Sequence, residues 1–297
     1  MIREPDFERG RFFISPILGC NAQCHFCYIY DKGYSTRSVK NRFEIGQVIE
    51  YLNSHPNFKI GNSGSIISIG AWGDPFPRNN RSLCEQSINW LQRLSEFGNP
   101  IQIMSRYELH KEIIEKIVKS NQYFGHILYS TSISSIKNFR KIEPYSDLPH
   151  KRLNSVRLLS KAGLSTNVMI KPFIRGITDL EANEIADILT EYEVRQCVVG
   201  DLLLDNRVKD KLSSTGVLIN TKTDITNRQI LDCTSGESYE VNTSSDMNDF
   251  CNLLSNLGIK VFKKSSCVNA FILGQPNPAN YIKSDPHGYC IKCGVCK

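Results

Sequence analysis

Three cysteines near the N-terminus, Cys20, Cys24 and Cys27, form a Cys-x3-Cys-x2-Cys run directly after an apolar segment, residues 12–18. A structural zinc ion takes four ligands, and an ordinary 4Fe-4S cluster takes four thiolates. Three thiolates on one short loop can instead hold a 4Fe-4S cluster whose fourth iron stays open for another molecule. The alternatives are a zinc knuckle or three unrelated thiols. The spacing therefore predicts a redox-active metal site on this loop.

A second cysteine run ends the chain. Cys290, Cys293 and Cys296 are spaced Cys-x2-Cys-x2-Cys, and Cys267, 23 residues before the first of them, is the natural fourth ligand. We expect an auxiliary 4Fe-4S cluster here, with a structural zinc ion as the alternative. His287 is an alternative ligand, although a lone histidine in a loop is more often solvated.

The overall composition fits an ordinary globular protein. The chain has 297 residues, a formal charge of +6 and 22% charged residues. This charge permits a nucleic-acid partner without arguing for one, and we see neither a membrane-spanning stretch nor a signal peptide. We therefore expect a cytoplasmic protein, in which thiols stay reduced. We expect the scattered cysteines to be buried, small apolar residues: Cys84, Cys197, Cys233 and Cys251.

Strand-like and helix-like segments alternate from about residue 10 to residue 204. The apolar, strand-like runs cover residues 12–18, 65–70, 101–104, 126–132, 166–172 and 197–204. Apolar residues at helical spacing lie between them, and capping boxes are predicted at Ser82–Glu85 and Thr178–Glu181. A last helix over residues 246–257 and a short strand over 259–262 follow a polar, loop-rich insertion at 205–245. From Cys267 onward we expect no regular structure.

Six strand–helix units with short connections predict a parallel sheet with helices outside it. Right-handed crossovers favour a barrel or partial barrel, and a doubly wound open sheet is the alternative. In either fold, functional groups gather at the carboxyl ends of the strands, where the first cysteine loop would lie. We divide the chain into a core barrel (1–204), an insertion with the last helix and strand (205–264) and a metal-binding tail (265–297).

The first cysteine run, with the aromatic Phe26 just before its third cysteine, resembles the signature of the radical S-adenosylmethionine (SAM) superfamily. The resemblance implies a partial (βα)6 TIM barrel, here with a C-terminal cysteine-rich extension. It also implies that Cys20, Cys24 and Cys27 hold a catalytic 4Fe-4S cluster whose open iron binds SAM. The zinc knuckle becomes the minor alternative for this loop.

The resemblance also suggests SAM-binding groups after successive strands. Gly73 and Asp74 occupy the place of the superfamily's glycine-rich motif, and Ile174 lies in a stretch similar to its adenine-binding segment. Hydroxyl groups at strand ends would bond the ribose, and a cation would pair the SAM carboxylate. The hydroxyl candidates are Ser105, Ser130 and Ser132, and the cation candidates are Arg106 and Arg152.

Within the superfamily, residues 10–192 look most like the spore photoproduct lyase-like branch. Among the segments that carry this likeness are Gly73-Asp74-Pro75, Glu143-Pro144 and the stretch from Pro172 to Asp179. One departure concerns the hydrogen-donating cysteine that the lyase keeps after the second strand. This loop here reads Ala71-Trp72-Gly73, without a thiol, and repair of the thymine lesion by the same route is therefore doubtful.

The resemblance implies a reaction in which flavodoxin or ferredoxin reduces the cluster and SAM is cleaved to a 5′-deoxyadenosyl radical that takes hydrogen from a substrate. A second cluster in the tail would accept an electron from a product radical. Three functions are carried forward. The first is a radical SAM enzyme acting on a small molecule, nucleotide or peptide. The second is a nucleic-acid lesion repair or base-modifying enzyme. The third is a non-catalytic iron–sulfur redox or metal-binding module.

Overall fold

The computed structural model describes residues 5–8, 11–217, 225–230, 238–241, 243–275 and 277. Its main sheet has eight strands in the order β1-β2-β5-β6-β7-β8-β9-β13. Their bounds are β1 Asp6–Glu8, β2 Arg11–Ile14, β5 Ile66–Ile69, β6 Ile101–Met104, β7 Ile127–Ser132, β8 Ser165–Phe173, β9 Gln196–Asp201 and β13 Lys260–Phe262.

The strands from β2 to β13 are all parallel, and β1 alone runs antiparallel, beside β2. The predicted mixed α/β fold with a largely parallel sheet is therefore confirmed. Strand order follows chain order, so the described strands lack the reversal that defines a doubly wound sheet. No pairing between β2 and β13 closes this sheet into a barrel within the described residues.

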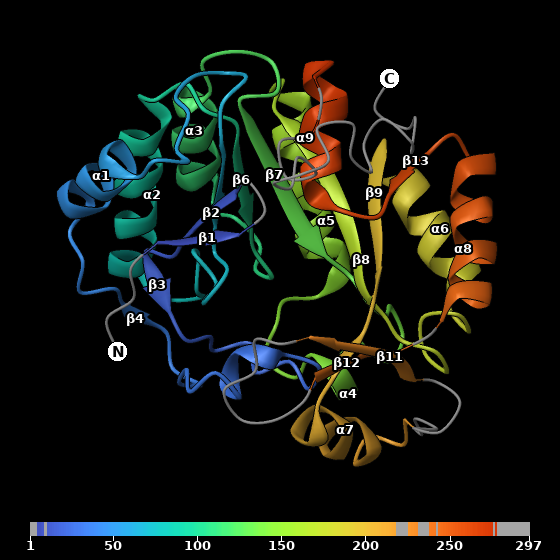
Figure 1. Ribbon diagram of the computed structural model, residues 1–297. Helices are drawn as coiled ribbons and strands as arrows, with labels where there is room; N and C mark the ends of the chain where they lie inside the picture. The colour runs from blue at the N-terminus through green and yellow to red at the C-terminus, as the bar shows by residue number, and fades with distance from the viewer. Residues whose placement is uncertain are drawn as a thin grey trace.

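Helices cover one face of this sheet. They are α1 Ile45–Ser54, α2 Arg81–Ser95, α3 Lys111–Ser120, α5 Pro149–Lys161, α6 Ala182–Glu191 and α8 Ser244–Asn256. Each contributes apolar side chains to a single buried cluster with the strands, for example Leu91, Ile117 and Leu189. Figure 1 shows α9 Ser265–Leu273 in front of the sheet, where it contacts β8, β9 and β13.

Successive side chains of β7 belong to two different buried clusters, which shows that α9 packs on the face of the sheet opposite to the outer helices. Ile127 and Tyr129 join the cluster formed by the outer helices, whereas Leu128, between them, packs with Cys267 and Val268 of α9. Successive side chains of a strand point to opposite faces of a sheet. The sheet is thus buried on both sides, which explains its nearly continuous apolar strands.

Two sequence-based expectations about regular structure are wrong. The run 12–18 is not one strand, because it breaks at Ser15-Pro16: β2 ends at Ile14, and β3 (Ile17–Leu18) pairs antiparallel with β4 (Val39–Lys40). Proline has no backbone N–H to continue a ladder. The segment from Cys267 is helical, since α9 buries an apolar face against the sheet and ends at Gly274 in the left-handed region.

Both predicted capping boxes are also absent. Helix α2 begins after Asn80, whose side chain accepts a hydrogen bond from Leu83 N at 3.2 Å, and Glu85 pairs with Arg81 instead. Helix α6 begins only at Ala182. Glu181 turns back to the loop after β7, where its carboxylate accepts bonds from the backbone N–H groups of residues 136–138. Hydrogen bonds from this distant loop have thus replaced the predicted capping contact of Glu181 within its own helix.

The polar insertion has more regular structure than its composition indicates. It forms α7 (Asn206–Ser213) and a small antiparallel sheet in the order β10-β12-β11, with bounds Leu203–Leu204, Ser238–Val241 and Ile225–Ile230. Val208 and Leu212 of α7 belong to the same buried cluster as Cys20 and Cys24. The insertion therefore packs over the first cysteine loop, near α4 (Phe139–Ile142) in Figure 1.

Substitution of Gly19 by alanine is expected to destabilise the chain by more than the ~1–2 kcal/mol that a left-handed residue costs alone. Gly19 has φ +73°, and an added Cβ would lie 2.3 Å from Arg37 O and 2.6 Å from Ser35 O. Gly163→Ala is the matched control, because Gly163 has φ +83° and nothing within 4 Å of its Cβ position. Denaturant midpoints compare the two variants; equal losses of stability would contradict the close approach at Gly19.

Candidate functional site

The first cysteine loop is attached to the carboxyl end of β5 by a close backbone contact. Gly19 N donates to Trp72 O at 2.8 Å, and Gly19 and Gly73 form an isolated parallel bridge. A Cβ on Gly73 would lie 2.5 Å from Gly19 O, so a side chain at this position would push the loop away. Gly73, a predicted cofactor contact, also permits this approach. Within the loop, Tyr30 donates its hydroxyl hydrogen to Cys20 O at 3.0 Å.

The three thiols lie in one buried cluster of side chains and form no disulfide. Cys20 and Cys24 are buried and Cys27 is half-buried. Burial raises the pKa of each of these thiols to about 12. Buried thiols of this kind become thiolates when a metal takes over the negative charge. The donor set thus suits a soft metal centre.

Within the described residues, no three His, Cys, Asp or Glu side chains gather as ligands of one metal ion. In a 4Fe-4S cluster each thiolate binds a different iron, so the sulfur atoms need not converge on one point. Three thiols of one loop, two of them buried and one half-buried, are the part of the ligand set that such a cluster takes from the protein. The residues present fit this group.

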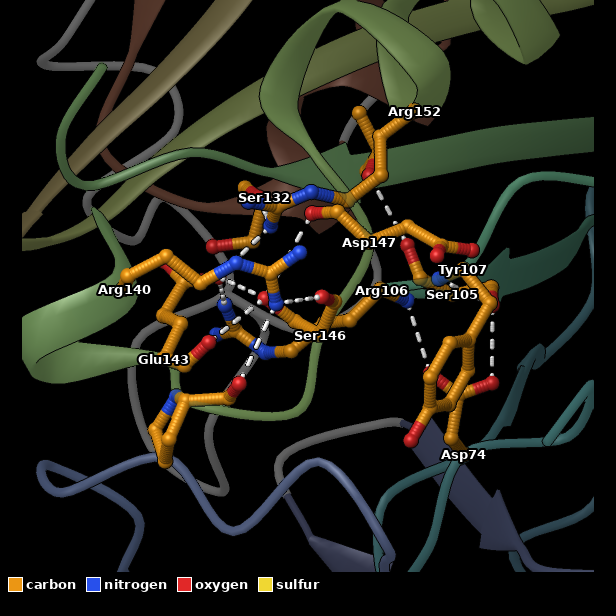
Figure 2. Close-up of polar contacts among 12 residues, drawn as sticks. Asp74, Ser105, Arg106, Tyr107, Ser132, Arg140, Glu143, Ser146, Asp147 and Arg152 are labelled. Carbon is orange, nitrogen blue, oxygen red and sulfur yellow. Dashed lines mark hydrogen bonds and ion pairs between the residues drawn. The ribbon is translucent and has the colours of Figure 1, made fainter. Parts of the chain in front are cut away.

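Asp74 connects the ends of two neighbouring strands. Its carboxylate accepts hydrogen bonds from Ser105 Oγ at 2.8 Å, from Arg106 N at 2.7 Å and from Phe76 N at 2.9 Å. Burial raises the pKa of Asp74, and these donors oppose the shift. The contact fixes the backbone of Arg106 at the end of β6, as Figure 2 shows.

Glu143 lies between two arginines and is itself fully buried (Figure 2). Its Oε2 is 2.7 Å from Arg152 Nη1 and 3.3 Å from Arg106 Nη1. Arg152 is 0% exposed and also donates to Ser132 O. Two cations thus share one carboxylate beside the cysteine loop.

Arg106 is the arginine that reaches the cysteines. Its guanidinium lies 4.9 Å from the ring centroid of Phe26. Burial alone would lower the pKa of Arg106, but Cys24 and Glu143 outweigh it and the pKa is raised. Its Nη1 has no hydrogen-bond acceptor of good geometry among the described residues. Arg106 therefore presents a fixed positive charge, with donor capacity to spare, at the cysteine loop.

A cavity of about 300 Å³ opens at the carboxyl ends of the strands, beside these groups. Of the predicted site residues, those that line it are Cys20, Cys24, Phe26, Cys27, Gly73, Asp74, Arg106 and Ser130. Thiols, an arginine and the ends of several strands thus meet at one space, as expected for functional groups of a parallel α/β sheet.

Four predicted cofactor contacts lie outside the cavity lining. Ser105 bonds Asp74, and Ser132 donates to Lys171 O at 2.9 Å. Arg152 is buried behind Glu143, and the backbone N–H of Ile174 donates to Thr178 Oγ1 at 2.9 Å. These groups hold the strand ends in place and do not face the cavity.

Sequence reasoning missed four charged residues of the site, and one of them, Arg11 at the start of β2, lines the cavity. Lys171 and Asp201, at the ends of β8 and β9, both line the cavity. Each is a charged residue at the end of an apolar run, and this pattern could have identified both as candidate site residues. Glu143 follows the short helix α4 and carries no periodic signal, so only the fold shows that it is buried between arginines.

Helix α7 covers the cysteine loop through Tyr30. Arg207 and Lys211 of this helix each place their charge 5.0 Å from the Tyr30 ring centroid. Arg207 also lies 3.5 Å from Asp31, immediately after Tyr30. Two cation–π contacts to one ring thus tie the insertion to the loop that carries the thiols.

The predicted second metal site falls largely outside the described residues, as do Cys233, His287 and the cysteines Cys290, Cys293 and Cys296. Cys267 lies on α9, packed with Leu128, Val198 and Phe262 in a cluster that excludes the first three cysteines. Its sulfur is 3.3 Å from Asn277 Nδ2, so the chain returns to Cys267 after α9. Cys197 is fully buried, and Cys84 and Cys251 are half-buried.

Comparison with solved structures finds this fold in spore photoproduct lyase. A cysteine-to-serine mutant superposes with a TM-score of 0.63 at 15% identity, over 84% of this chain and 75% of that one. Another mutant, with bound AdoMet and dinucleoside spore photoproduct, gives 0.63 at 14% identity over the same shares. The lyase complexed with dinucleoside spore photoproduct gives 0.60 at 15% identity and equal coverage.

The chain shares the fold of this enzyme. At these identities the likeness concerns the fold alone. No family model matches the sequence, and no curated protein does. No helix of the described part of the chain has the length and apolar character needed to cross a membrane.

Proposed function

We propose that the chain is a radical SAM enzyme whose cluster is held by Cys20, Cys24 and Cys27. One observation carries this proposal: the three thiols and Arg106 line one cavity at the strand ends of a sheet with the fold of spore photoproduct lyase. The Cys-x3-Cys-x2-Cys spacing supplies the signature, and the lyase mutant named above was solved with bound AdoMet. We further propose that the sheet is the partial barrel of this superfamily.

The chain's own residues would bind and orient the reactants. Cys20, Cys24 and Cys27 would hold the 4Fe-4S cluster, which when bound would supply the one-electron reducing power for SAM cleavage and the radical chemistry that follows. Arg106, with its free donor capacity, would pair the SAM carboxylate beside the thiols. Asp74 would fix the backbone of Arg106 through its hydrogen bond to Arg106 N. Phe26 would orient the Arg106 guanidinium through a cation–π contact. Arg152 serves Glu143 and is too deeply buried for a direct role.

The substrate is proposed to be a small molecule, a nucleotide or a peptide. Nucleic-acid lesion repair is the second candidate, favoured by the fold likeness to spore photoproduct lyase. Ala71 and Gly73 line the cavity, and they belong to the loop where the resemblance would require a hydrogen-donating cysteine. Cys84 is half-buried, and its thiol donates to Pro77 O at 3.7 Å. This counts against chemistry of the lyase type.

For the tail, we propose a second 4Fe-4S cluster bound by Cys267, Cys290, Cys293 and Cys296, with zinc as the alternative. The position of Cys267 on α9, at the face of the sheet away from the outer helices, supports a centre separate from the first cysteine loop. A flavodoxin- or ferredoxin-type protein would supply electrons, and a cytoplasmic location suits oxygen-sensitive clusters. A non-catalytic iron–sulfur module remains the competing function for the whole chain.

The deciding experiment is anaerobic reconstitution with iron and sulfide, followed by SAM and dithionite. We expect about eight irons per chain and formation of 5′-deoxyadenosine. The variant Cys20→Ala/Cys24→Ala/Cys27→Ala should lose about four irons and all deoxyadenosine. Replacing the tail cysteines should remove about four irons, or one zinc if the alternative holds. A loaded, reducible protein that forms no deoxyadenosine would favour the non-catalytic module.

A further inference from the structure

The face of the main sheet that points toward α9 carries buried polar side chains. In β5, Ile67 and Ile69 join the cluster beneath the outer helices, so Ser68 between them points to the α9 side. Gln102 of β6 does so for the same reason and lies beside Ser68 in the pairing register. The interior of a parallel α/β barrel is usually filled by branched apolar side chains. Polar groups in this position therefore call for a functional explanation.

Ser68 and Gln102 belong to one hydrogen-bonded group that connects the sheet to α9. Gln102 Oε1 accepts from Ser68 Oγ at 2.9 Å and from Ser265 Oγ at 3.4 Å. Arg11 Nη1 donates to Ser265 Oγ at 3.5 Å, and Gln102 Nε2 donates to Asn269 Oδ1. Four of these residues line the cavity that the three thiols also line, and we call them the inner subsite: Arg11, Ser68, Gln102 and Ser265.

Arg11 directs its charge toward this cavity. It is the first residue of β2, and its guanidinium carbon lies 4.7 Å from the ring centroid of Phe13. Phe12 and Ile14 join the cluster beneath the outer helices, so Arg11 and Phe13 share the opposite face. The Arg11 side chain therefore runs along the strand toward its carboxyl end, where the cavity opens.

The hydrogen-bonded group offers more donors than acceptors. Arg11 has a planar fork of N–H donors and no acceptor. The side-chain nitrogen of Asn269, a residue 1% exposed, has no acceptor among the described residues. No member of the group is an acid. The complement to a guanidinium with surplus donors beside it is an anionic group, since carboxylates and phosphates accept paired hydrogen bonds from arginine.

We propose that the inner subsite binds the carboxylate or phosphate group of a small substrate. This inference rests on the proposed function, in which Arg106 holds SAM in the same cavity. The subsite lies between the sheet and α9, which Figure 1 shows in front of the sheet, and the whole cavity measures about 300 Å³. Such a space admits the charged end of a small molecule and not a polymer backbone. The substrate class is thus a small anionic molecule.

Saturation-transfer NMR tests this proposal on the iron-loaded protein, saturated with SAM under anaerobic conditions. The probes are acetate and methyl phosphate, with tetramethylammonium as the probe of opposite charge. We expect saturable binding of the anions and none of the cation. The anion that binds more tightly identifies the group that the substrate carries, a carboxylate or a phosphate.

Arg11→Met should weaken anion binding about tenfold, through loss of a charge-assisted pair, and Arg11→Lys should weaken it less. Ser265→Asp places a carboxylate beside Arg11 and should compete with the probes. An acid in the first turn of a helix is favourable, so α9 should remain folded. Arg93→Met, on α2 and paired with Glu96, is the matched control and should bind the anions as the wild type does. Iron content at the wild-type level shows that each variant is folded.

Three results would overturn the inference: no binding of either anion to the wild type, equal binding of tetramethylammonium, or wild-type anion affinity in both Arg11→Met and Ser265→Asp. Deoxyadenosine formation by the wild type with dithionite tests the proposed function separately. A wild type that binds the anions and forms no deoxyadenosine would remove the proposed function and leave an anion-binding site. The opposite result would remove the inner subsite alone.

Discussion

Replacing Glu143 by alanine is expected to destabilise the folded chain by about 3–5 kcal/mol, because this carboxylate is the partner of a fully buried arginine. Arg152 is 0% exposed, and its Nε and Nη2 already have no hydrogen-bond partner among the described residues. Without Glu143, its positive charge would remain in a site from which water is excluded. Equilibrium unfolding in urea at pH 7 gives the free-energy difference.

Two comparison variants separate charge from shape at this position. The double variant Glu143→Leu/Arg152→Met removes both charges and should regain most of the lost stability. Lys137→Ala breaks an exposed ion pair with Glu184 and should cost no more than about 1 kcal/mol. A loss for Glu143→Ala no larger than that of Lys137→Ala would contradict the assignment of a buried pair.

The strands were predictable from sequence because the sheet is buried on both faces. Such strands appear as unbroken apolar runs, and four of the six runs match β5 to β8 closely, with β6 matching at Ile101–Met104. The run 197–204 is only partly right, because β9 ends at Asp201 and Leu203–Leu204 joins the small antiparallel sheet as β10. The cysteine loop was predictable because its spacing is local. Its position at the carboxyl end of a strand follows from the general rule for parallel sheets.

The elements that sequence reasoning missed depend on contacts between distant segments. Helix α9 is stabilised by the inner face of the sheet, and Cys267 and Val268 pack with Leu128 and Val198. The insertion looked like a loop because few of its residues are apolar, yet Val208 and Leu212 suffice to bury α7 over the cysteines. Glu181 had the pattern of a capping residue, but the N–H groups of a distant loop compete for its carboxylate.

The same dependence on tertiary structure separates Arg106 from Arg152. Arg106 follows a predicted strand and Arg152 begins a predicted helix. Their sequence surroundings do not indicate which of the two would contact a ligand. The fold aims Arg106 at the cavity, where Phe26 and the thiols meet it, and encloses Arg152 behind Glu143. One arginine is available to a ligand and the other neutralises a buried acid.

Replacing Arg106 by methionine is therefore expected to weaken SAM binding about ten- to a hundredfold, the loss of one charge-assisted hydrogen-bonded pair. Iron content should stay at the wild-type level, because the three thiols are unchanged and Glu143 keeps Arg152 as its partner. Arg106→Lys retains the charge without the planar fork, and its SAM affinity should fall between those of the wild type and Arg106→Met.

Arg78→Met is the matched control, since Arg78 pairs with Asp147 and does not line this cavity. Anaerobic calorimetry with SAM measures each affinity on the iron-loaded protein. Wild-type affinity in Arg106→Met would show that the SAM carboxylate is held elsewhere, with Lys171 and Arg11 the other cations on the cavity wall.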